Sequence, residues 1–159
     1  INATCALLER MVHACPGQAV DGRITAPIFH SVSVPGIIAS DYLVTYLVRL
    51  GLAKKEEMAD AVVLHALCLI DRLLQMQTPN GLHLCESNVH RILLVAMVLS
   101  CKMLDDDLYN NKYWATVGGV TLTHLNLLEE HMTQLLDFRL LISERTLEAV
   151  RFRLLHPLA

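Results

Sequence analysis

The stretch RILLVAMVLSCKML, from Arg91 to Leu104, decides the fold of this chain. Its ten residues from Ile92 to Cys101 carry no charge and almost no polarity. A helix that lacks a polar face is stable only when other elements surround it. We therefore expect a helix over 86–104 to form the centre of a helical bundle, with Lys102 emerging at its end.

Further helical patterns lie on both sides of this central segment. Apolar residues recur at helical spacing over 2–14, 41–50, 55–77, 111–117, 123–138 and 143–155. Residues that favour helix starts precede several of them, namely Ser40 or Asp41, Thr121 or Thr123, and Ser143. Prolines and glycines cluster over 16–38, which we interpret as an ordered connector anchored by Ile24, Ile28, Phe29, Val32 and Val34. No strand pattern competes, so the sequence predicts an all-α fold.

The composition limits the classes of function. A chain of 159 residues fits one domain, and 53% hydrophobic with 5% aromatic residues predicts an aliphatic core. A mean hydropathy of +0.41 is high for a soluble monomer, so we expect surplus apolar surface to meet another protein. The net charge of −3, without a basic stripe, argues against nucleic acid as a partner. No apolar run reaches the roughly 18 to 20 residues of a membrane span, so we expect no membrane association.

The cysteines indicate a reducing compartment. There are five, an odd number without a CxxC pair, and Cys68 and Cys101 fall inside apolar helical runs. Buried, reduced thiols are typical of intracellular proteins, so we expect the protein in the nucleus, the cytoplasm or both. Because the first residue is Ile1 rather than Met, we also expect the sequence to be a fragment of a longer chain.

Possible catalytic and metal sites have simpler explanations. His65 and Cys68 share a helix face, and His83 lies near Cys85, but a tetrahedral zinc site needs about four ligands with suitable spacing. The aspartates 105–107 are consecutive, whereas a calcium loop uses alternate positions, so we expect a solvated loop. Gly118-Gly119 lacks the lysine of a phosphate-binding loop and is interpreted as a helix stop. We predict no metal, no cofactor and no enzymatic activity.

Charged residues recur among apolar neighbours on three successive long helices. They are Asp71-Arg72 in LCLIDRLL, Lys102 in LLVAMVLSCKMLDD, and Glu129 in LNLLEEHMTQLLDFRL. Together these segments resemble the cyclin box. The segments YNNKYWATVGGVTLTHLNLLE (109–129) and FHSVSVPGIIASDYL (29–43) are similar to P/U-type cyclins, the group typified by the fungal phosphate-pathway cyclin. The resemblance covers about residues 29–142.

The resemblance implies a domain organisation and a function. It implies one five-helix cyclin box over 39–142, preceded by an N-terminal helix and connector (1–38) and followed by a C-terminal helix (143–159). It also implies a regulatory subunit, monomeric when free, that binds and activates a cyclin-dependent protein kinase. The alternatives are a cyclin-fold adaptor that binds no kinase and a transcription-factor-IIB-like module that binds nucleic acid, against which the charge argues.

The resemblance also implies roles for individual residues. Lys102 and Glu129 correspond to the kinase-binding pair of the family, and we expect Leu99, Met103 and Thr133 to lie beside them at the kinase contact. Asp71, Arg72, Gly118 and Gly119 are expected to be structural. The family pattern has an arginine where this chain has Thr45, so Asp71 needs another partner, for which we consider Arg49 or a backbone donor.

Overall fold

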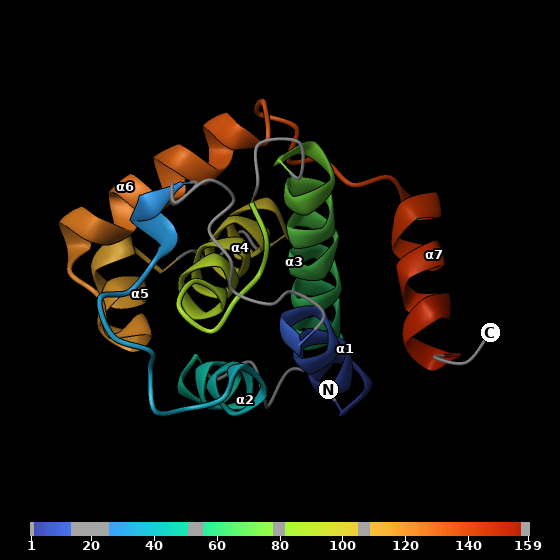
Figure 1. Cartoon of the computed structure of the whole chain (residues 1–159). Helices are drawn as coiled ribbons and strands as arrows, with labels where there is room; N and C mark the ends of the chain where they lie inside the picture. Colours follow the sequence, from blue (N-terminus) through green and yellow to red (C-terminus); the bar gives the residue numbers. More distant parts are fainter. Residues whose placement is uncertain (1, 14–25, 51–55, 78–81, 105–108, 157–159) are drawn as a thin grey trace.

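The computed structural model of the chain describes residues 2–13, 26–50, 56–77, 82–104 and 109–156. Within these ranges the regular secondary structure is entirely helical, which confirms the all-α prediction (Figure 1). The elements are α1 (Asn2–His13), the 3-10 helix η2 (Pro27–Phe29), α2 (Ala39–Arg49), α3 (Glu56–Gln77), α4 (Val89–Leu104), α5 (Asn111–Gly118), α6 (Leu122–Leu135) and α7 (Glu144–Leu155). None of the described helices combines the length and apolarity needed to cross a membrane.

Helix α4 lies at the centre of the bundle, as predicted. Every residue from Ile92 to Cys101 is buried. Figure 1 shows α4 with α3 on one side, α5 and α6 on the other and α2 below it, and α4 contacts α2, α3 and α6 directly. Each fully buried aliphatic side chain contributes about 1.5–3 kcal/mol. The apolar surface of α4 therefore determines where the surrounding helices pack.

The outer helices begin partly as predicted. Thr121 caps α6 and Ser143 caps α7, each through its side-chain oxygen. The predicted cap of α2 by Ser40 or Asp41 is wrong, because α2 begins after Ile38 without a side-chain cap. The Ser40 hydroxyl instead donates to Glu9 Oε1 of α1 at 2.5 Å, so it joins two helices rather than starting one.

The glycine pair at the end of α5 stops that helix, as predicted, and also lets it pack closely. Gly119 has φ +69°, a left-handed conformation that glycine adopts without strain. A Cβ atom on Gly118 would lie 2.6 Å from Leu94 Cδ2 of α4. The Gly118 carbonyl also accepts a hydrogen bond from the Tyr42 hydroxyl at 3.1 Å. The pair therefore fixes α5 against both α4 and α2.

The connector before α2 is described from residue 26 onward. Phe29 is buried, and Arg91 of α4 donates to the carbonyls of Ile28 (3.2 Å) and His30 (2.5 Å). The prediction that Val32 and Val34 anchor this segment is wrong, because both side chains are exposed. Hydrogen bonds from the Arg91 side chain to backbone carbonyls, which sequence patterns do not reveal, take over that role.

Several predicted features lie outside the described residues. They are the anchor Ile24 and the aspartates 105–107. The limits of the three predicted segments (1–38, 39–142 and 143–159) stay predictions. Helix α7 packs on α3 and α1 at the outside of the bundle (Figure 1). Its residue Val150 is buried.

Candidate functional site

Lys102 and Glu129 form an ion pair between two helices. Lys102 lies in the last turn of α4, and Glu129 lies on α6. The distance from Lys102 Nζ to Glu129 Oε1 is 2.5 Å, and the side chains are 29% and 20% exposed. A cation in the last turn of a helix is stabilised by the helix dipole. The buried central helix thus ends in a charge that reaches the surface beside a carboxylate.

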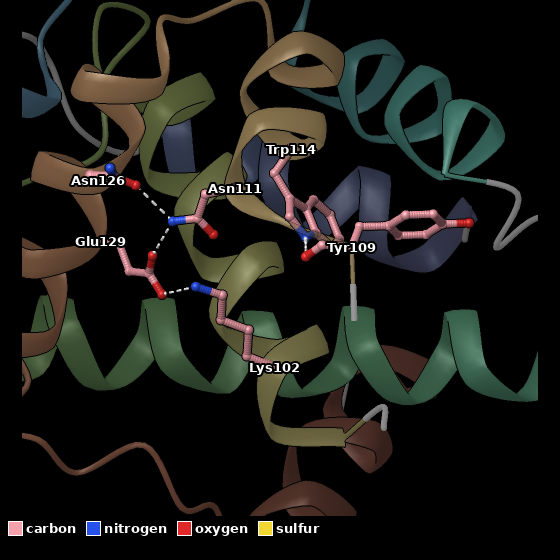
Figure 2. A network of polar contacts seen from close by, with 6 residues as sticks. All are labelled: Lys102, Tyr109, Asn111, Trp114, Asn126 and Glu129. Carbon is pink, nitrogen blue, oxygen red and sulfur yellow. Dashed lines mark hydrogen bonds and ion pairs between the residues drawn. The ribbon is translucent and has the colours of Figure 1, made fainter. Parts of the chain in front are cut away.

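Two asparagines complete the environment of Glu129 (Figure 2). Asn111 Nδ2 donates to Glu129 Oε2 at 2.7 Å and to Asn126 Oδ1 at 2.8 Å. Both carboxylate oxygens of Glu129 therefore have a donor from this chain. The sequence analysis missed the two asparagines. The only available signal was the i, i+3 spacing of Asn126 and Glu129, which places them on one face of α6.

The start of α5 is held firmly against the bundle. The Asn110 side chain caps α5 by accepting from Tyr113 N at 3.0 Å. The Trp114 indole is buried and donates to the carbonyl of Tyr109 at 3.1 Å (Figure 2). The ring of Tyr109 stacks on that of Tyr113, with centroids 4.4 Å apart. These contacts fix the backbone on both sides of Asn111.

The residues predicted to flank the pair differ in exposure. Met103 is 37% exposed, and Leu104 beside it is also exposed. Thr133 is half-buried one turn beyond Glu129 on α6. Leu99 is only 4% exposed and packs in the core, because α4 is covered on all sides before its last turn. The expectation that Leu99 contacts a partner is therefore withdrawn.

Phe138 is a large exposed side chain beyond the end of α6 that was not predicted from the sequence. We predicted that the helix reaches Phe138, but α6 ends at Leu135. Asp137 and Phe138 have φ of +52° and +56°, and Phe138 N donates to Thr133 O at 2.9 Å. This left-handed turn leaves Phe138 72% exposed. Such strained residues are uncommon outside glycine and often occur at functional sites.

Arg72 has the structural position expected of it. Its Nη1 atom donates to the carbonyls of Arg139 (2.5 Å) and Leu141 (2.9 Å). Arg72 thus ties the segment after α6 to α3 and holds the turn that carries Phe138.

Asp71 does not have the partner we considered. It is half-buried and accepts from Gln75 Nε2, one turn further along α3, at 2.7 Å. Arg49 instead donates to the carbonyl of Val117. Asp71 therefore has another partner in the absence of an arginine at the position of Thr45, as expected, but that partner is a glutamine side chain rather than Arg49 or a backbone donor.

The histidines and cysteines that the structure describes do not gather into a metal site. In the described part of the chain there is no group of three or more His, Cys, Asp or Glu residues that could hold a metal ion. His65 Nδ1 is 2.9 Å from Ser100 Oγ, and burial lowers the pKa of His65. Burial also raises the pKa of the Cys68 thiol to about 11, so this sulfur stays protonated at neutral pH.

The helical bundle, the central apolar helix and the Lys–Glu pair together define the class of protein. The family model for cyclins matches residues 6–140. The chain belongs to the cyclin family.

The relatives of the chain include plant U- and P-type cyclins and a fungal regulator. It is 36% identical over 126 residues to Cyclin-U1-1 of Arabidopsis thaliana, covering 79% of this chain and 56% of the relative. It is 42% identical over 64 residues to Cyclin-P1-1 of Oryza sativa subsp. japonica, covering 40% of this chain and 24% of the relative. It is 32% identical over 123 residues to the Nuc-1 negative regulatory protein preg of Neurospora crassa, covering 77% of this chain and 24% of the relative.

The predicted resemblance to P/U-type cyclins is confirmed by these matches, and membership of the cyclin family supports a regulatory role. The chain spans about half the length of Cyclin-U1-1 and Cyclin-U4-2 of Arabidopsis thaliana.

Proposed function

We propose that this chain is the regulatory subunit of a cyclin-dependent serine/threonine protein kinase, which it binds and activates without performing chemistry itself. The observation that carries the proposal is the Lys102–Glu129 pair at the end of the buried central helix. We call the surface formed by Lys102, Met103, Glu129 and Thr133 the pair face.

A kinase partner has a specific mechanical need that the pair face can meet. Protein kinases require a helix of the small lobe to be positioned so that its glutamate pairs with the lysine that binds ATP phosphates. A regulatory subunit has to present a rigid surface to that helix. Helix α4 is suited to this task because its burial on all sides prevents it from shifting without disrupting the core.

The pair face combines apolar contact with charge. Met103 is exposed and can bury apolar area against a partner. Lys102 has three donor protons, and one hydrogen bond to Glu129 leaves the others for acceptors of the kinase backbone or side chains. In interfaces of this kind, apolar anchors supply most of the affinity and charged groups fix the register.

The remaining expectations belong to the same proposal. We propose that the free chain is a monomer and that the complex acts inside the cell, in the nucleus, the cytoplasm or both. The net charge of −3 continues to argue against a nucleic-acid partner.

The test uses the purified 159-residue chain and a panel of purified cyclin-dependent kinases. Calorimetry measures binding, and the phosphorylation rate of a generic peptide substrate measures activation. We expect at least one kinase to bind and its rate to rise tenfold or more. The variant Lys102→Ala should weaken binding, whereas Glu130→Ala, an exposed neighbour on α6 that contacts Gln134, should not.

Two outcomes would contradict the proposal. Binding to a kinase without a rise in rate would identify an adaptor rather than an activator. Failure to bind any kinase of a panel that spans the family would reject the kinase-binding function altogether.

A further inference from the structure

We infer that Asn111 is a positioning residue, which holds the Glu129 carboxylate in the one orientation that leaves Lys102 poised for a partner. This inference rests on the proposed function, because it concerns how the pair face recognises a kinase. Figure 2 shows Asn111 between Asn126 and Glu129, with Lys102 on the other carboxylate oxygen.

The hydrogen bonds fix the orientation of the Asn111 amide. Glu129 Oε2 and Asn126 Oδ1 both accept from Asn111 Nδ2, at 2.7 and 2.8 Å. An amide nitrogen carries two protons, and a carboxylate oxygen can only accept. The NH₂ group of Asn111 therefore has to face Glu129, and both of its protons are used. Asn126 thereby keeps the donor of Asn111 directed at the carboxylate.

The position of Asn111 is set by the rest of α5. Asn110 caps the helix, and the buried Trp114 side chain bonds the carbonyl of Tyr109. Gly118 at the other end of α5 packs against Leu94 of α4. The start of α5 is thus attached to the bundle independently of the ion pair, so Asn111 can restrain Glu129 rather than follow it.

The restraint has a chemical consequence for the pair. Asn111 is neutral, so it orients the Glu129 carboxylate without neutralising its charge. Lys102 then remains the cation that balances Glu129, and the contact with Glu129 Oε1 fixes the position of its ammonium group. Without Asn111, Oε2 would lose its donor within the chain, and the carboxylate could rotate away from the position that aligns Lys102. A partner would have to order the pair as it binds, which costs affinity.

The test compares two substitutions of Asn111 in the kinase complex. Hydrogen bonds to charged groups typically contribute enough that Asn111→Ala should weaken kinase binding about tenfold or more. Asn111→Asp keeps the shape but removes the donor and places a second negative charge beside Glu129. We expect a larger loss, about a hundredfold. Lys112→Ala serves as the matched control, because Lys112 is exposed on the same helix, and it should bind normally.

An exchange of the two groups separates positioning from a general structural role. In Asn111→Asp combined with Glu129→Gln, the new amide can donate to the new carboxylate, so one hydrogen bond and one negative charge remain. We expect the double variant to bind at least about tenfold better than the product of the two single losses predicts. If the single losses simply multiply, Asn111 acts through folding alone and the inference is wrong.

A measurement on the free chain does not depend on any kinase. The side-chain NH₂ protons of Asn111 should be protected from exchange in NMR spectra, and Glu129→Ala should remove that protection. Absence of protection in the wild-type chain would overturn the inference. If the wild-type chain binds no kinase, the proposed function fails; if Glu129→Ala weakens binding while Asn111→Ala does not, only the inference about Asn111 fails.

Discussion

The pair of Lys102 and Glu129 allows a quantitative prediction for the kinase complex. In the free chain the two side chains are 29% and 20% exposed, so either group can be solvated when the other is removed. Exposed ion pairs contribute about 1 kcal/mol or less. We therefore expect Lys102→Ala or Glu129→Ala to lower the melting temperature of the free chain by only about 2–4 °C.

In the complex the same substitutions should have a much larger effect. The kinase would cover the pair, and removing one partner would leave the other charge desolvated and unpaired. Such truncations cost about 2–5 kcal/mol, which corresponds to roughly 30-fold to several-thousand-fold weaker binding. The combined variant, Lys102→Ala with Glu129→Ala, should cost less than the sum of the two single variants, because it leaves no charge without a partner.

The assay is a double-mutant cycle on kinase affinity, measured by calorimetry, with thermal melts of each free variant. If the single variants bind the kinase normally while their free forms melt early, Lys102 and Glu129 are stabilising residues of the fold. The reasoning that places them at the interface would then be refuted.

Three further predictions concern stability and are read from thermal or denaturant unfolding. Gly118→Ala should cost about 1–3 kcal/mol because its Cβ would meet Leu94, whereas Gly36→Ala, with nothing within 4 Å, should be nearly neutral; equal effects would contradict this packing. Because burial lowers the pKa of His65, the unfolded chain takes up a proton first as pH falls through about 6.5. The free energy of unfolding should therefore fall from pH 7 to 5, and less steeply in His65→Gln; identical slopes would exclude His65 as a cause. Asp71→Ala should cost about 0.5 kcal/mol or less, since its partner lies one turn away on the same helix; a loss above about 2 kcal/mol would require a further partner.

The features that could be predicted from the sequence depend on local or periodic signals. The apolar run Ile92–Cys101 predicts a central helix because a helix at the surface would carry polar residues at helical spacing. Thr121 and Ser143 are predicted as caps because a helix start needs an acceptor at that position. Lys102 and Glu129 were found through the family resemblance, since nothing in their spacing reveals that two helices bring them together.

The features that could not be predicted depend on tertiary contacts. The left-handed turn at Asp137 and Phe138 is held by Arg72, which is more than sixty residues away in the sequence. Asn111 and Glu129 meet only because α5 and α6 pack together. Leu99 is buried because neighbouring helices cover its side of α4. A helix that is apolar on every side does not indicate which residues near its end stay exposed.

The single tryptophan provides an intrinsic optical reporter of this site. Trp114 is buried, and its indole donates a hydrogen bond to the carbonyl of Tyr109, two residues before Asn111. Its fluorescence should therefore be blue-shifted in the folded chain and should respond to any movement of α5. Because the chain has no other tryptophan, its emission can follow changes at the pair face in real time without a label. The binding of a partner that lacks tryptophan can be followed in the same way.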